Sequence, residues 1–112
     1  MSTSSKNYNQ LSQDLLEAIK NKKATKKFTD QLATVPKEEL NAALKTDKEK
    51  LAFWINIYNS YIILILRDNP ELYEDRNAFF KKEQVKTVGE MLSFDKIEHG
   101  IIRSSNRKTY II

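Results

Sequence analysis

Cysteine is absent from this chain, and glycine, proline and histidine are rare. Its 112 residues include two glycines, two prolines and one histidine. Without cysteine, these residues hold no disulfide, no thiolate metal site and no cysteine nucleophile. Gly89 and Gly100 are isolated from each other, which excludes a glycine-rich phosphate loop. Because a single histidine is also too few for a typical zinc site, we expect no bound metal and no cofactor.

Long apolar runs are missing as well. The most apolar stretch, residues 55–66, is interrupted by polar side chains. It is also shorter than the roughly twenty residues that a membrane-spanning helix needs. The first residues, MSTSSKNYNQ, lack the basic and then apolar pattern of a secretory signal. The sequence therefore predicts a protein that does not bind membranes and that resides in the cytoplasm.

The composition that is present is that of a folded helical domain. Hydrophobic residues make up 40% of the chain and charged residues 30%, which suits a globular protein with one core. Residues 1–7 are polar and are predicted to be disordered, and residues 8–112 are predicted to form a single domain. Apolar residues at helical spacing predict helices over residues 9–22 and 28–35, and Pro36 fits the first turn of a third.

A longer central helix follows these three. Thr46 and Glu49 have the spacing of a capping box, which predicts a helix over residues 48–68. Asn69 and Pro70 would end this helix, and Pro70 could open a further short one.

The remaining segments predict a hairpin and a last helix. Residues 85–88 and 91–92 alternate in polarity around a turn at Gly89 and Glu90, which is typical of a β-hairpin. Ser93 is a suitable cap for the helix FDKIEHGIIR. The predicted fold class is therefore mainly α, with α+β character: a helical domain around one buried central helix, with a small β-hairpin.

The central helix contains polar side chains where apolar ones are expected. Asn56, Asn59 and Ser60 fall on one stripe about 100° wide, together with Ala52 and Ile63. The other faces are apolar, so we expect a helix that is buried nearly all round. A buried amide that lacks a partner costs about 1–3 kcal/mol. The two asparagines therefore either bond to neighbouring backbone, which residue chemistry favours, or line a cleft and hold a substrate.

Two blocks of sequence, AFWINIYNS (52–60) and LSFDKIEHGIIR (92–103), resemble the DUF547 family, a domain of unknown function. The matching positions are Ala52, Phe53, Trp54, Ile55, Asn56, Tyr58 and Asn59, and then Leu92, Ser93, Asp95, Ile97, Glu98, His99, Ile101 and Arg103. The similarity is strongest over residues 44–103. Members of that family typically continue with a strand that carries a second histidine and with a Ser-Cys-Pro segment, neither of which follows here. The resemblance thus implies the N-terminal part of such a domain only, and it implies no established activity.

The second block contains the one candidate general base, His99. Asp95 and Arg103 lie four residues to either side of it, and Glu98 is its neighbour. A carboxylate at either position could orient the imidazole. Residue types alone favour the simpler interpretation, in which Glu98 and His99 anchor neighbouring backbone. The candidate catalytic residues are His99, Glu98 and Asn59, and the candidate binding residues are Asn56, Trp54 and Arg103.

Three functions are compatible with these patterns. We favour a non-catalytic scaffold or interaction module, which could have a protein partner. The second is a hydrolase or transferase half-site that uses His99 as base and takes its nucleophile from other sequence. The third is weak nucleic-acid binding by the lysines within residues 20–27. A solvated surface is the favoured interpretation of those lysines, because no arginine or aromatic residue is interleaved with them.

The end of the chain, residues 108–112 (KTYII), indicates the start of a strand with an exposed edge. We expect this segment either to pair with a second copy or to be buried loosely in its own core. An isologous two-fold homodimer is the simplest form of such pairing.

Overall fold

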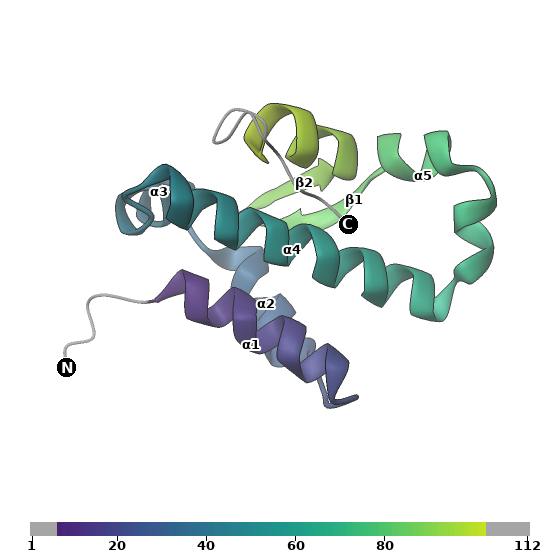
Figure 1. The fold of residues 1–112 in the computed structure, drawn as a ribbon, viewed down its shortest axis with the longest axis horizontal. Helices are drawn as coiled ribbons and strands as arrows, with labels where there is room; N and C mark the ends of the chain where they lie inside the picture. The colour runs from purple at the N-terminus through teal and green to yellow at the C-terminus, as the bar shows by residue number, and fades with distance from the viewer. Residues whose placement is uncertain (1–6, 103–112) are drawn as a thin grey trace.

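The structure, a computed structural model, describes residues 7–102 (Figure 1). Its elements are α1 (Tyr8–Lys20), α2 (Lys26–Thr34), α3 (Lys37–Ala43), α4 (Asp47–Asp68), the 3₁₀ helix η1 (Pro70–Glu74), α5 (Arg76–Lys81), the strands β1 (Glu83–Thr87) and β2 (Glu90–Ser93), and the π-helix η2 (Lys96–Ile102). The prediction of a mainly helical domain with a small β-hairpin is confirmed. The predicted disorder of residues 1–6, the role of Arg103 and the strand over residues 108–112 lie outside the described residues.

The start of α4 is fixed by its own sequence. The Thr46 hydroxyl accepts a hydrogen bond from the Glu49 N–H (3.1 Å), and the Glu49 carboxylate accepts one from the Thr46 N–H (3.0 Å). Glu49 also accepts from the Lys45 N–H (2.8 Å). These backbone donors lower the pKa of the Glu49 carboxyl, because they stabilise its charged form. The predicted capping box is therefore confirmed, as is the end of the helix at Asp68.

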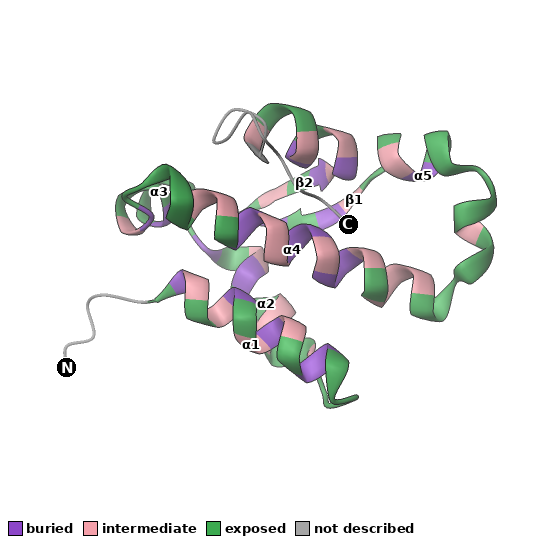
Figure 2. Cartoon of the chain, viewed as in Figure 1, coloured by how far each residue is buried: buried purple, intermediate pink, exposed green. Residues whose placement is uncertain are grey.

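The other elements pack around α4. In Figure 1, α1 runs along one side of α4, and the hairpin and η2 lie on the other side. Buried side chains from both sides meet α4 in one core, and Figure 2 colours the buried residues of each element purple. The core includes Leu15 from α1, Phe53 and Ile57 from α4, Phe94 between β2 and η2, and Ile97 from η2.

The hairpin is attached by its tip to the end of α2. Its two turn residues, Val88 and Gly89, have positive φ angles of 54° and 70°, as a two-residue hairpin turn of type I′ requires. Their N–H groups donate to the carbonyls of Leu32 (2.7 Å) and Ala33 (2.9 Å). The turn was predicted one residue later, at Gly89 and Glu90. That prediction was wrong because a β-branched residue with positive φ is not expected from sequence.

Three other sequence predictions need correction near helix ends. Asn7 was assigned to the disordered N-terminus, but its side chain caps α1 by accepting from the Gln10 N–H (2.9 Å). Pro36 precedes α3 instead of lying in its first turn. The short helix expected from Pro70 is a 3₁₀ helix, and the unpredicted helix α5 follows it.

The last helix begins as expected but has a different form. The Ser93 hydroxyl accepts from the Lys96 N–H (3.0 Å), which confirms the predicted cap. Residues 96–102 then form a π-helix, in which each backbone hydrogen bond joins residues five apart. The α-helix assumed for this segment was therefore wrong. Sequence patterns do not separate the two forms, and tertiary contacts decide between them.

Candidate functional site

The polar stripe of α4 is the least covered face of that helix. Ala52 is exposed, Asn56 and Asn59 are half-buried, and Ile63 is 40% exposed. Only Ser60 is fully buried there. The expectation that α4 is buried all round was therefore wrong, because no element covers the whole of this stripe.

Asn56 joins α4 to α1. Its Nδ2 donates a hydrogen bond to the hydroxyl of Ser12 (3.1 Å), and that buried hydroxyl donates to the carbonyl of Asn9 (2.8 Å). The side-chain amide of Asn59 forms no hydrogen bond with any residue between 7 and 102. Asn59 is half-buried, which leaves this amide open to water. The expected pairing of both asparagines with backbone was wrong: Asn56 binds a side chain, and Asn59 binds none of the described groups.

Glu98 joins η2 to α4. Its carboxylate accepts a hydrogen bond from the hydroxyl of Tyr58 (3.1 Å), which is only 3% exposed. Burial is the largest cause that raises the pKa of Tyr58, followed by the charge and hydrogen bond of Glu98 and the charge of Asp95. Because this hydroxyl stays protonated, it remains a donor. The ring of Phe94 meets the Tyr58 ring edge-on at 5.3 Å and covers this contact.

His99, the candidate base, is exposed beside this pair. Within the described part of the chain, the His99 imidazole makes no side-chain hydrogen bond or ion pair. The carboxylate of Glu98, one of the two that could orient the imidazole, accepts from Tyr58 instead. The favoured interpretation, in which Glu98 anchors neighbouring backbone, was wrong as well, because the partner of its carboxylate is a side chain. The candidate binding residue Trp54 is 8% exposed and packs edge-on against Phe53 at 5.1 Å. Its position is that of a core residue, which residue chemistry had favoured.

The structure does not bring the candidate residues between 7 and 102 into one cleft. Asn56 and Tyr58 are two positions apart on α4, or about 200° around the helix, so they face different neighbours. Asn56 faces α1, whereas Tyr58 faces η2 and Glu98. The partners Ser12 and Tyr58 were not proposed as site residues. Tyr58 lies within the first family block, but no feature of the sequence marks Ser12.

Neither a cluster of metal-ligating side chains nor a membrane-spanning helix is present within residues 7–102. No group of three or more His, Asp and Glu side chains within residues 7–102 is placed to hold a metal ion. None of the helices in this part of the chain is both long enough and apolar enough to cross a membrane.

A comparison with protein families assigns the chain. The model of a family described as "Protein of unknown function, DUF547" matches residues 41–111. The chain belongs to the DUF547 family. The match contains both sequence blocks, so the predicted resemblance over residues 44–103 is confirmed. No curated protein and no solved structure matches the chain.

The family match divides the molecule at α3. Helices α1 and α2 precede the matched residues, and α4, the hairpin and η2 lie within them. In this DUF547 chain the two blocks meet through the Tyr58–Glu98 contact, and the first block meets α1 through Asn56. The polar side chains that make these contacts connect helices to one another.

Proposed function

We propose that this DUF547 domain is a non-catalytic scaffold or interaction module. One observation supports this most: a polar side chain from each family block connects two helices. Asn56 bonds to Ser12, and Glu98 bonds to Tyr58. A catalytic base needs a group that orients it, and the carboxylate next to His99 is already engaged. A cytoplasmic location is part of the same proposal.

The hydrolase or transferase half-site is the second candidate. It is favoured by the exposure of His99, which leaves the imidazole accessible to a substrate or to a nucleophile from other sequence. If the half-site is correct, the chain takes part in a catalytic activity that is lost in His99→Ala. The module predicts that the same variant associates like the parent chain.

The association we propose uses the outer edge of β2. Strands β1 and β2 form a two-stranded antiparallel sheet, and no third strand among the described residues pairs with β2. Leu92 points into the core, whereas Met91 is 49% exposed. Hydrogen-bonded and non-bonded pairs alternate along such a ladder, so the Met91 N–H is directed away from β1. An open edge of this kind accepts an added strand.

Residues 108–112 are the segment that we propose for this edge. Their strand-like sequence would add to β2 of a second copy, and reciprocal pairing would give an isologous homodimer. The module is therefore expected to be dimeric, and the dimer is expected to depend on backbone hydrogen bonds along β2.

Light scattering of the chain after size-exclusion chromatography tests this proposal. The intact chain should be a dimer, and the chain without residues 108–112 should be a monomer. Met91→Pro should also give a monomer, because proline removes the outward N–H, and Met91→Thr is the matched control that keeps it. Circular dichroism would check that each variant is folded. An intact chain that stays monomeric at the highest concentration tested would overturn the strand-addition dimer.

A further inference from the structure

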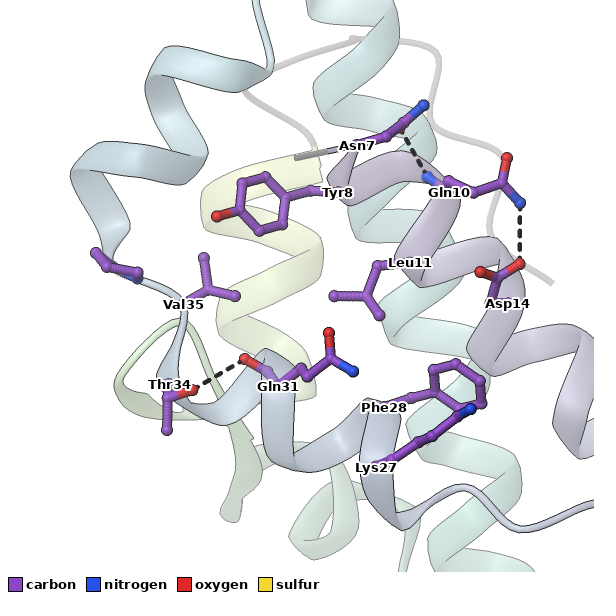
Figure 3. A pocket seen from close by; sticks show the side chains of 11 residues that line it. Asn7, Tyr8, Gln10, Leu11, Asp14, Lys27, Phe28, Gln31, Thr34 and Val35 are labelled. Atoms are coloured by element: carbon purple, nitrogen blue, oxygen red, sulfur yellow. Dashed lines mark hydrogen bonds between the residues drawn. The ribbon is translucent and has the colours of Figure 1, made fainter. Parts of the chain in front are cut away.

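A groove lies between α1 and α2, outside the family match. A hollow of about 540 Å³ separates these helices, and Tyr8, Leu11, Phe28 and Val35 form its apolar lining. Figure 3 shows Leu11 directed from α1 into the hollow, with the ring of Phe28 at one end and Tyr8 with Val35 at the other. A second hollow of about 500 Å³ shares Phe28 with the first. We call the two together the α1–α2 groove.

The Phe28 end of the α1–α2 groove is basic. Residues 20–27 contain five lysines and no acidic residue. Lys23 and Lys27 line the groove and form no ion pair within the described residues, and the Lys27 ammonium lies 5.1 Å from the centre of the Phe28 ring. Lys26, by contrast, is paired with Asp30 (2.8 Å).

Acidic side chains are also present along the α1 wall. Asp14 and Glu17 line the groove, and Asp14 accepts a hydrogen bond from Gln10 (2.9 Å). The positive charge is therefore concentrated at the loop between the helices and not spread along the whole groove. A suitable occupant must combine an apolar side chain for the lining with acidic groups at the loop.

The chain itself presents a surface with this combination. Residues 68–75 contain four acidic residues and no lysine or arginine, and all four acidic side chains are exposed. Tyr73 lies among them and is 39% exposed; its ring contacts Phe79 and Phe80 edge-on, and the Arg76 guanidinium lies 5.5 Å from the ring centre. Arg67 and Arg76 border the segment, so its negative charge is confined to residues 68–75. We call residues 68–75 the acidic corner.

We propose that the acidic corner of one copy docks in the α1–α2 groove of a second copy. Tyr73 would enter beside Phe28, and the carboxylates of Glu71 and Glu74 would face Lys23 and Lys27. Paired charges at the rim of a contact speed association and define its orientation. Their attraction is screened by salt. The contact uses different surfaces from the β2 edge and does not rest on the strand-addition dimer.

Nucleic acid is the competing occupant of the same lysines. Nucleic acid would contact these lysines through its phosphates, and a base could stack on Phe28, but Tyr8, Leu11 and Val35 further along the groove would stay uncovered. The complementary corner on the same chain makes a second copy the better fit.

Sedimentation of the full-length chain at about 0.05 M and about 0.5 M salt tests the contact, since the Debye length falls several-fold over this range. We expect a self-association that weakens at the higher salt. Lys23→Glu with Lys27→Glu should weaken it about tenfold, as should Glu71→Lys with Glu74→Lys. All four substitutions together should restore it. Lys45→Glu with Lys48→Glu changes the net charge as much as the groove pair, but both residues are exposed at the start of α4, outside the groove lining and the acidic corner, and this pair should have no effect.

Three results would overturn the proposal. Equal weakening by the control pair would mean that net charge alone governs association, and failure of the fourfold variant to recover would mean that the two surfaces do not meet. Binding of a labelled oligonucleotide through Lys23 and Lys27, without self-association, would assign the lysines to nucleic acid. If deletion of residues 108–112 abolishes the dimer but leaves the salt-dependent association intact, that result supports the strand-addition dimer and leaves the groove contact standing.

Discussion

The two sides of α4 are held by different kinds of contact. On the α1 side the polar link is neutral, from the Asn56 amide to the Ser12 hydroxyl, whereas on the η2 side a buried phenol donates to a carboxylate, from Tyr58 to Glu98. Hydrogen bonds to charged groups are worth more than neutral ones. The η2 side lies within the family match, and the α1 side pairs a family helix with a segment that precedes it. The charged contact thus belongs to the family region, and the neutral one attaches that region to its N-terminal helices.

The largest losses in the free energy of unfolding are expected for fully buried apolar side chains, one on each side of α4. Phe94 is fully buried and stacks on Phe79 at 5.3 Å, and Leu15 is fully buried on the α1 side. Phe94→Ala should lower the free energy of unfolding by about 3–5 kcal/mol and Leu15→Ala by about 2–5 kcal/mol, through lost burial and cavities. Urea denaturation measures both. A loss below about 1 kcal/mol for Phe94→Ala would mean that η2 and its preceding residues are not part of the core.

Removing the phenol tests the charged link directly. Tyr58→Phe leaves Glu98 without its donor and should cost about 1–2 kcal/mol at neutral pH, because half-buried Glu98 can recover part of the loss from water. Tyr73→Phe is the matched control. Its ring is partly exposed, and we expect a change within about 0.5 kcal/mol. Equal changes in the free energy of unfolding for Tyr58→Phe and Tyr73→Phe would show that the hydrogen bond from the Tyr58 hydroxyl to Glu98 does not stabilise the fold.

Alkaline pH should weaken the Tyr58–Glu98 contact on the η2 side. The folded-state pKa of Tyr58 lies above its ordinary value of 10.0. Its contribution is therefore complete below about pH 10 and is lost as the pH rises above that value towards the folded pKa. Unfolding free energies measured between pH 8 and pH 11 should fall less steeply in Tyr58→Phe than in the parent. Tyr8, whose pKa burial and Glu39 raise to about 12, contributes a similar slope that Tyr58→Phe leaves in place. Tyr61, whose pKa burial and then the charge of Asp30 raise to about 12, adds a slope of its own that is present in parent and variant alike. Identical slopes in parent and variant would contradict the assignment.

The smallest changes in stability are expected for the two asparagines of the polar stripe, and they should differ from each other. Asn56→Leu should cost about 1 kcal/mol, because the buried Ser12 hydroxyl loses a donor. Asn59→Leu should change stability by no more than about 0.5 kcal/mol, because its amide has no protein partner to leave behind. The sequence alone had predicted a cost of about 1–3 kcal/mol for Asn59→Leu. Chemical denaturation of the two variants side by side decides whether the stripe is covered at Asn59.

Features set by neighbouring residues could be predicted from the sequence. The capping box of Thr46 and Glu49 and the cap at Ser93 each join residues three apart, and both are present. The candidate site depends on contacts between residues 44 and 40 positions apart. Spacing along the chain did not indicate that Tyr58 would meet Glu98 or that Asn56 would meet Ser12. The shift of the hairpin turn to Val88 has the same origin, because carbonyls of α2 hold that turn in place.

The attachment of the hairpin to α2 also has a consequence during synthesis. The Thr87 hydroxyl bonds to the Leu32 carbonyl (3.4 Å) across 55 residues of chain, beside the bond from the Val88 N–H. At about 5–20 residues per second, the ribosome adds the hairpin between about 3 and 11 seconds after α2. An isolated helix as short as α2 is only marginally stable in water. During this interval the last carbonyls of α2 can bond only to water, and the helix becomes complete when the hairpin arrives.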